Sequence, residues 1–155
     1  MGKLKVGIIG CGGIANQKHF PALKNNADLA EMVAFCDIIE ERATKAAEEY
    51  GVEGAKVYTD YRELLADPEI DIVHICTPNV SHSKIAVDAF AAKKNVYCEK
   101  PMSHNPEEAQ KMVDAWKESG MKFTIGYQNR FRPEVQNLHA SCEKGELGEI
   151  YYGKA

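Results

Sequence analysis

The sequence predicts an α/β protein built on a doubly wound parallel sheet. Short apolar runs rich in β-branched residues recur along the chain, segments with helical spacing separate them, and the first run ends at a glycine cluster. Strands that alternate with helical segments are typical of βαβ units, whose strands pair in parallel. We therefore expect six strands in one sheet with helices on both faces.

Strands are expected where β-branched and aromatic residues form short runs bounded by turn residues. The run at 71–76 is the most strand-like because it contains Ile72, Val73 and Ile75. We interpret His74, within this run, as a core histidine rather than a catalytic one. In chain order, the expected strands are 6–9, 32–36, 57–58, 71–76, 95–98 and 122–127.

Helices are expected where apolar or alanine-rich positions recur at helical spacing between these runs. Pro21 lacks a backbone N–H, so it should end the first helix and begin a second helical turn. Asp60 can cap a helix that ends before Pro68, and Gly51 and Gly120 stop two others. In chain order, the expected helices are 13–18, a turn from 21, 40–50, 61–66, 81–93, 107–119 and 133–144.

Residues 10–15, GCGGIA, fit the pattern G-x-G-x-x-G/A. The first glycine allows a tight turn, the second lets the backbone approach a diphosphate, and the small last residue permits close helix packing. The first amides of the next helix lack intrahelical partners and lie at the positive end of its dipole, so they can hold a diphosphate without a lysine. A purely structural turn is the alternative. The candidate diphosphate-binding residues are Gly10, Gly12, Gly13 and Ile14.

Asp37 follows the second expected strand and lies 22 residues after Ala15, close to the offset of the acidic residue that binds an adenosine ribose. Its carboxylate would accept hydrogen bonds from the 2′- and 3′-hydroxyls. It would repel a 2′-phosphate by about 4 kcal/mol, for unit charges about 4 Å apart at an effective dielectric constant of about 20. The sequence therefore favours NAD over NADP. The alternative is that Asp37 caps the next helix.

Composition and charge exclude several classes of protein. With 155 residues, of which 45% are hydrophobic and 27% charged, the chain suits one domain with a core and neither a disordered nor a membrane protein. The net charge of −4 argues against a nucleic-acid binder, which usually has a basic face. No apolar run approaches the length of a membrane span and the N-terminus has no signal-peptide core, so we expect a cytoplasmic protein.

Five cysteines occur without C-x-x-C spacing. Cys36, Cys76 and Cys98 lie at the ends of expected strands, where small buried thiols are common. We therefore expect reduced thiols, with no disulfide framework and no metal site.

Further motifs follow the glycine turn in order: an aspartate after the second strand, CTPNVSH at 76–82, CEKP at 98–101 and GYQNRFRP at 126–133. With them, essentially the whole chain resembles the N-terminal half of the Gfo/Idh/MocA oxidoreductase family, a Rossmann-fold domain. Many nucleotide-binding proteins share the glycine motif, but the ordered set, above all Glu99-Lys100-Pro101, is much more specific. The resemblance implies hydride transfer between a nicotinamide cofactor and a sugar, cyclitol or related hydroxyl compound.

The resemblance also implies roles for residues at the carboxyl ends of later strands, where open α/β sheets bind ligands. The implied cofactor-binding residues are Thr77, Pro78, Asn79, His82, Glu99, Lys100 and Gln128. The implied substrate-binding residues are Lys100, Asn129 and Arg130.

Lys100 is the expected catalytic residue. In a partly dry cleft beside a positively charged nicotinamide ring, its ammonium form would be disfavoured, so it could exchange a proton with an alcohol as hydride leaves. A surface lysine paired with Glu99 is the alternative. For His82, hydrogen bonding at the start of a helix and a catalytic role are both open.

The family continues into a second α+β domain, a mostly antiparallel sheet that covers the cleft and supplies substrate contacts. We expect residues 1–145 to form the NAD(P)-binding domain and residues 146–155 to be the first strand of the second domain, which is otherwise absent or truncated. Without that domain, hydride transfer should be slow or absent, because water stays in the cleft and half of the substrate pocket is lacking.

Two other functions are open. The chain could be a non-catalytic nucleotide-binding or interaction module that forms a homo-oligomer through residues 146–155, because an unpaired strand is a template for association and Ile150, Tyr151 and Tyr152 are apolar. Size-exclusion chromatography would test this hypothesis. The second open function is that of a methyltransferase with a similar glycine turn. The EKP and GYQNRF segments disfavour it, and a test of S-adenosylmethionine binding would decide.

Overall fold

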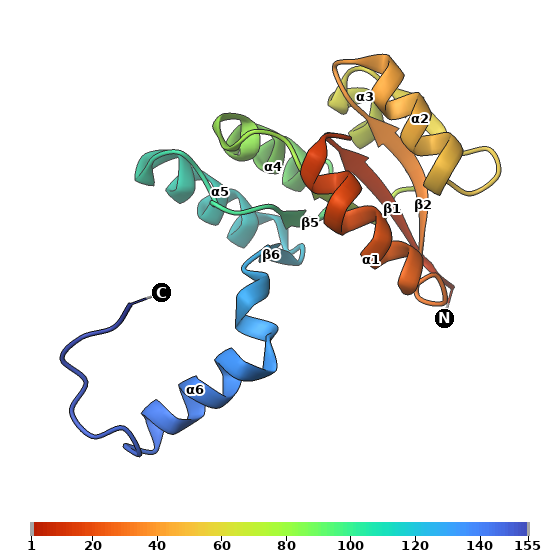
Figure 1. Ribbon diagram of the computed structural model, residues 1–155. Coiled ribbons are helices and arrows are strands. Elements are labelled where there is room, and N and C mark those ends of the chain that lie inside the picture. The colour runs from red at the N-terminus through yellow and green to blue at the C-terminus, as the bar shows by residue number, and fades with distance from the viewer. Residues whose placement is uncertain (1, 155) are drawn as a thin grey trace.

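The computed structural model describes residues 2–154 and contains one six-stranded, fully parallel sheet (Figure 1). The strand order is β3-β2-β1-β4-β5-β6, so the order reverses between β1 and β4. Open α/β sheets bind ligands at such a switch point. In chain order, the strands are β1 Leu4–Ile9, β2 Ala30–Cys36, β3 Lys56–Tyr58, β4 Ile72–Ile75, β5 Asn95–Cys98 and β6 Phe123–Ile125.

Helical segments connect the strands, which confirms the predicted doubly wound α/β fold. The ends of the elements differ from the expected ones by a few residues at most, apart from the first helix and the C-terminal segment. Asp60 caps α3, as predicted, by accepting a hydrogen bond from Arg62 N–H. After the first helix, the helices are α2 Glu40–Tyr50, α3 Tyr61–Ala66, η2 Asn79–Ser81, α4 His82–Ala91, α5 Pro106–Ser119, η3 Gln128–Phe131 and α6 Pro133–Glu143.

Two apolar cores lie on opposite faces of the sheet. One contains Phe20 from the first helix and Ile8 of β1, and the other contains Phe90 of α4 and Ile9 of β1. Adjacent residues of β1 thus enter different cores, as the alternation of side chains along a strand requires. Both faces of the central strands are buried, which explains their nearly continuous apolar sequences.

The helix after the glycine turn is continuous, so the predicted break at Pro21 is wrong. Helical structure starts at residue 13, passes through the π-helical turn η1 Ala15–His19, and continues as α1 Phe20–Asn25. In the π-turn, Phe20 N–H donates to the carbonyl oxygen of Ala15, five residues earlier. The wider turn accommodates Pro21, which has no N–H to donate and would collide with the preceding turn of a regular α-helix.

The C-terminal segment extends away from the sheet (Figure 1). Helix α6 has no buried residue, and residues 144–154 contain no strand. The expected strand at 146–155 is therefore not formed in the described part of the chain, because a strand needs a neighbour for its backbone hydrogen bonds. Ala155, the last residue of that range, and Met1 lie outside the described residues. Several apolar side chains of this segment are exposed: Leu147, Ile150, Tyr151 and Tyr152.

Candidate functional site

The residues that follow the central strands form a row along the carboxyl edge of the sheet. Their amides extend the parallel ladder, as Gly10 N–H donates to Cys36 O at 2.8 Å and Glu99 N–H donates to Ile75 O at 2.9 Å. The backbone thus brings residues of separate motifs to one edge. From β2 to β6, the row contains Asp37, Gly10, Cys76, Glu99 and Gly126.

In the glycine turn, Gly10 packs tightly against the residue that follows β4, whereas Gly12 and Gly13 border open space. Gly10 has a φ of 95°, and a Cβ at this position would lie 2.8 Å from the carbonyl carbon of Cys76. A Cβ at Gly12 would meet nothing within 4 Å, and a Cβ at Gly13 would meet only the Gln17 amide nitrogen at 3.9 Å. Open space therefore lies over the two glycines at the start of the helix.

Backbone donors border this open space. Within residues 2–154, no hydrogen bond uses the amide of Gly12, Gly13 or Ile14, as is usual for the first turn of a helix. The Cys11 amide differs, because it donates to Asp37 Oδ2 at 2.9 Å. Three successive amides at the positive end of a helix dipole make an arrangement suited to an anion.

Asp37 is held beside the glycine turn by both carboxylate oxygens. Oδ2 accepts the Cys11 amide and Oδ1 accepts the Ile39 amide, each at 2.9 Å, and the residue is 8% exposed. The alternative that Asp37 caps the next helix is wrong, since the N-cap of α2 is Ile39 and no side chain caps it. Each carboxylate oxygen can accept a further hydrogen bond, so Asp37 can still bind a ligand hydroxyl.

His82 joins the loops that follow β4 and β5. Its Nε2 lies 2.8 Å from the Thr77 carbonyl oxygen and its Nδ1 lies 2.8 Å from the Pro101 carbonyl oxygen. The residue is almost fully buried, so both ring nitrogens face backbone carbonyl oxygens inside the protein. This geometry favours the hydrogen-bonding alternative for His82 over the catalytic one. In the same loop, Pro78 is exposed and Asn79 is half-buried.

Glu99 belongs to a buried polar cluster that the sequence did not reveal. His19 Nε2 lies 2.9 Å from Glu99 Oε1, and His19 Nδ1 lies 3.1 Å from His74 Nδ1. The His74 ring stacks on Tyr97 with 4.8 Å between ring centroids. Burial, with a smaller effect from His19, lowers the pKa of His74 to about 3. The half-buried His74 is therefore neutral at physiological pH, and its contacts with His19 and Tyr97 favour the predicted structural role over a catalytic one.

Lys100 is exposed and forms no ion pair among the described residues. Glu99 pairs with His19 instead, and its Oε2 accepts the backbone N–H of Lys100 at 3.0 Å. The alternative of a surface ion pair between Glu99 and Lys100 is therefore wrong. After β6, three expected ligand-binding residues lie exposed in η3, with no hydrogen bond to Lys100: Gln128, Asn129 and Arg130.

The cysteines near this edge are poor nucleophiles. Burial raises the pKa of Cys11, Cys36 and Cys98 to about 12, and that of Cys76 well above its ordinary value. All four are free thiols, as is exposed Cys142. Within residues 2–154, no three histidine, cysteine or acidic side chains are grouped as a metal site would require. No helix in this part of the chain is long and apolar enough to span a bilayer.

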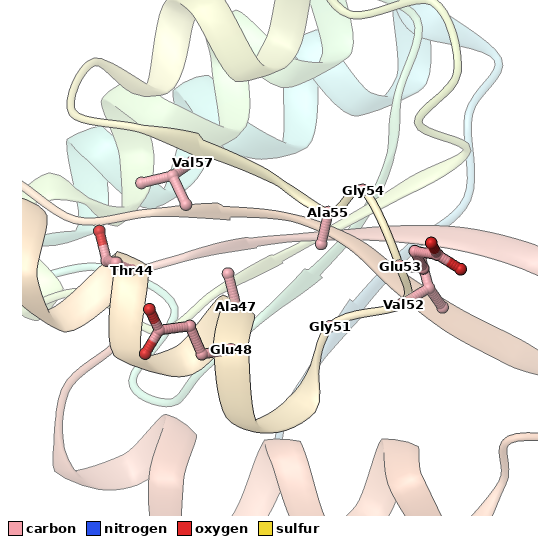
Figure 2. Close-up of a pocket in the computed structure, with 9 residues that line it drawn as sticks. All are labelled: Thr44, Ala47, Glu48, Gly51, Val52, Glu53, Gly54, Ala55 and Val57. Atoms are coloured by element: carbon pink, nitrogen blue, oxygen red, sulfur yellow. The ribbon is translucent and has the colours of Figure 1, made fainter.

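A separate hollow lies between α2 and the loop that leads to β3 (Figure 2). Two of the side chains around it, Glu48 and Glu53, are acidic, and none is basic. Such a lining does not suit a diphosphate, so the sheet edge remains the candidate site. The residues around the hollow are Thr44, Ala47, Glu48, Gly51, Val52, Glu53, Gly54, Ala55 and Val57.

Known proteins resemble this chain over nearly its whole length. The family model described as "Oxidoreductase family, NAD-binding Rossmann fold" matches residues 4–127. Inositol 2-dehydrogenase of Salmonella typhimurium is 35% identical over 147 residues, which cover 94% of this chain and 43% of that protein.

Solved structures share the fold. The WlbA dehydrogenase from Bordetella pertussis, in complex with NADH and UDP-GlcNAcA, matches with a TM-score of 0.89 at 31% identity, over 97% of this chain and 45% of that one. A 3-ketoreductase from Actinomadura kijaniata, in complex with TDP-benzene and NADP, matches with a TM-score of 0.86 at 27% identity. The match covers 96% of this chain and 45% of that one. The chain thus spans less than half the length of these relatives.

Proposed function

Since this chain belongs to the oxidoreductase family with an NAD-binding Rossmann fold, we propose that it binds NAD at the carboxyl edge of its sheet. The bound cofactor serves hydride exchange with a sugar, cyclitol or related hydroxyl compound. One observation carries the proposal: open space over Gly12 and Gly13 is bordered by three amides that have no partner among residues 2–154, beside the Asp37 carboxylate.

The glycine turn holds the diphosphate in this proposal. Hydrogen bonds to a charged acceptor contribute about 1.5–3 kcal/mol each, so the amides of Gly12, Gly13 and Ile14 suffice without a basic side chain. Gly10 supports them indirectly, because its positive φ and close approach to Cys76 set the path of the turn.

Asp37 selects NAD over NADP in this proposal. Structural relatives hold NADH in one case and NADP in another, so the preference of this chain depends on its own residues. The Asp37 carboxylate, fixed by two backbone amides, accepts the ribose hydroxyls. A 2′-phosphate would instead bring like charges together, at about 4 kcal/mol for charges about 4 Å apart at an effective dielectric constant of about 20.

The reactive end of the site lies at the loops after β4, β5 and β6. A bound nicotinamide supplies the hydride donor or acceptor. Lys100 exchanges a proton with the substrate hydroxyl. His82 lies between the loops that follow β4 and β5 and contacts both. Thr77, Pro78, Asn79, Glu99 and Gln128 line the nicotinamide end, while Asn129 and Arg130 contact the substrate.

The substrate class follows from the relatives together with Lys100. One relative is named for inositol, and another is solved with a UDP-sugar; both compounds carry secondary hydroxyls. In our proposal, residues 1–145 form the cofactor domain, and residues 146–155 begin a second domain that completes the substrate pocket. The protein works in the cytoplasm.

Calorimetric titration of the chain with NAD, NADP and ADP tests this function. NAD should bind more tightly than NADP, and ADP should bind because it carries the diphosphate and the ribose. Failure of all three to bind would contradict the proposal. Equal affinities for NAD and NADP would contradict the role of Asp37 alone.

A second candidate function is association through the C-terminal segment. Ile150, Tyr151 and Tyr152 are 56%, 96% and 75% exposed, and exposed apolar residues that are grouped in one segment favour association with another chain. Size-exclusion chromatography should then show an oligomer that deletion of residues 146–155 converts to a monomer. Elution of the undeleted chain as a monomer would contradict this candidate.

A further inference from the structure

His19 connects the helix of the glycine turn to the loop that contains Lys100. It is the last residue of the π-turn Ala15–His19 and is 6% exposed. Its ring reaches across to Glu99, 80 residues later in the chain, at 2.9 Å. Single π-turns within α-helices occur frequently at functional sites. Here the wide turn ends at His19, which makes a buried polar contact between two parts of the candidate site.

Glu99 uses both of its carboxylate oxygens in this connection. Oε1 faces His19, and Oε2 accepts the Lys100 amide at 3.0 Å. Glu99 is 8% exposed, and a buried carboxylate is costly unless it is hydrogen-bonded. Gly126, which follows β6, leaves room for it, because a Cβ there would lie 3.3 Å from Oε1 and 2.8 Å from the Tyr97 hydroxyl oxygen. The carboxylate is thus held between the helix and the Lys100 backbone.

His74 fixes the orientation of the His19 ring from the other side. The two Nδ1 atoms lie 3.1 Å apart, so one of them can donate a hydrogen bond to the other. A neutral His19 that donates from Nε2 to Glu99 Oε1 accepts at Nδ1, so the His74 Nδ1–H is then the donor between the two rings. The stacking of His74 on Tyr97 ties this arrangement to the centre of the sheet.

We propose that His19 is a positioning residue that holds the Glu99 carboxylate and thereby sets the backbone of Lys100 relative to the helix that binds the diphosphate. The inference rests on the proposed function, because it concerns the nicotinamide end of the same site. The two ends of the cofactor are then aligned by one buried contact. Loss of His19 should disturb the nicotinamide end and leave the ADP end intact.

The experiment compares His19→Leu, which removes the hydrogen bonds, with His19→Gln, which keeps a donor in place of Nε2. His139→Leu, in exposed α6, is the matched control. The readouts are the Lys100 amide resonance in NMR spectra and the calorimetric affinities for NAD and ADP. His19→Leu should shift the Lys100 resonance and weaken NAD binding about tenfold, comparable to the loss of one hydrogen bond, with ADP binding unchanged. His19→Gln should restore the Lys100 resonance and the NAD affinity, and His139→Leu should change neither of these two readouts.

An unchanged Lys100 resonance in His19→Leu would overturn the proposal, as would equal losses of NAD and ADP affinity, which would indicate a merely structural role. If the unmodified chain binds neither nucleotide, the proposed function fails, but the Lys100 resonance still decides the role of His19. Should His19→Leu not fold, Glu99→Gln replaces it. That variant should move the same resonance, and an unmoved resonance would refute the inference.

Discussion

At the scale of single residues, Asp37 is the side chain on which the cofactor preference depends. Replacing it by alanine removes the carboxylate and both of its backbone hydrogen bonds. We expect Asp37→Ala to weaken NAD binding about tenfold to a hundredfold, as the loss of hydrogen bonds to a charged group predicts, and to narrow the difference between NAD and NADP. Calorimetry measures both affinities, with exposed Asp28→Ala as the control. An unchanged NAD-to-NADP ratio would contradict the assignment.

Alanine variants of Gly10 and Gly12 distinguish an effect on the stability of the fold from an effect on cofactor binding. Gly10→Ala should destabilise the fold by about 1–3 kcal/mol, because its positive φ strains an L-residue and the Cβ would approach Cys76. Gly12→Ala should change the free energy of unfolding by less than about 0.5 kcal/mol, since nothing lies within 4 Å of its Cβ. Gly12→Ala should nevertheless weaken ADP and NAD binding at least tenfold, because the methyl group occupies the space of the diphosphate and displaces one of its hydrogen bonds. Urea denaturation and calorimetry measure the two effects, and normal binding by Gly12→Ala would contradict the location of the site.

His74 makes the free energy of unfolding depend on pH. Its pKa is about 3 in the fold and about 6.5 in an unfolded chain. Below pH 6.5, the unfolded chain therefore binds a proton that the folded chain excludes, so the free energy of unfolding decreases as the pH falls, by up to about 1.4 kcal/mol per pH unit. His74→Phe keeps a ring on Tyr97 and removes this titration. Its urea stability should fall less between pH 6.5 and 5, whereas exposed His104→Phe should behave like the unmodified chain.

At the scale of elements, the strands and most helices could be predicted because their side chains repeat with a period of two or 3.6. Helix α2 is an example, because its alanines recur at helical spacing and the expected range 40–50 agrees with the observed Glu40–Tyr50. The glycine turn and Asp37 could also be predicted, because their offset within one βαβ unit is local in sequence.

The connection between His19, His74 and Glu99 could not be predicted in the same way. His19 is 55 residues from His74 and 80 residues from Glu99, so only the assembled sheet brings them together. The choice between a broken and a widened helix at Pro21 likewise depends on tertiary contacts of this first helix. The prediction of a strand at 146–155 is wrong for a related reason. A strand requires a neighbouring strand for its backbone hydrogen bonds, and the local sequence does not specify that neighbour.

The cap of α5 gives a prediction at this scale. Asn105→Ala removes the acceptor for the Glu108 amide and should lower the free energy of unfolding by about 1 kcal/mol. Asn105→Ser keeps a side-chain acceptor and should retain most of the stability. Urea denaturation distinguishes the two, and equal stabilities of the alanine and serine variants would show that the cap contributes little.

At the scale of the whole molecule, the candidate site is assembled by the sheet rather than by any one segment. Parallel ladders bring the glycine turn, Asp37, Glu99 and Gly126 to one edge, and the two cores below keep that edge in place. Four buried cysteines lie near the same edge, at or just after the ends of β1, β2, β4 and β5. Their reactivity therefore reports whether the edge opens.

We expect the native chain to react with iodoacetamide at Cys142 alone. Cys142 is exposed, whereas the other cysteines are buried and have raised pKa values, about 12 for Cys11, Cys36 and Cys98. A thiol with a pKa of about 12 is only about one part in ten thousand thiolate at pH 8, and the thiolate is the reactive form. Intact-mass spectrometry at pH 8 should show one rapid adduct in buffer and five in urea, matching the five cysteines. Cys142→Ser should remove the rapid adduct, and any rapid adduct that remains in that variant would show that the sheet edge opens without global unfolding.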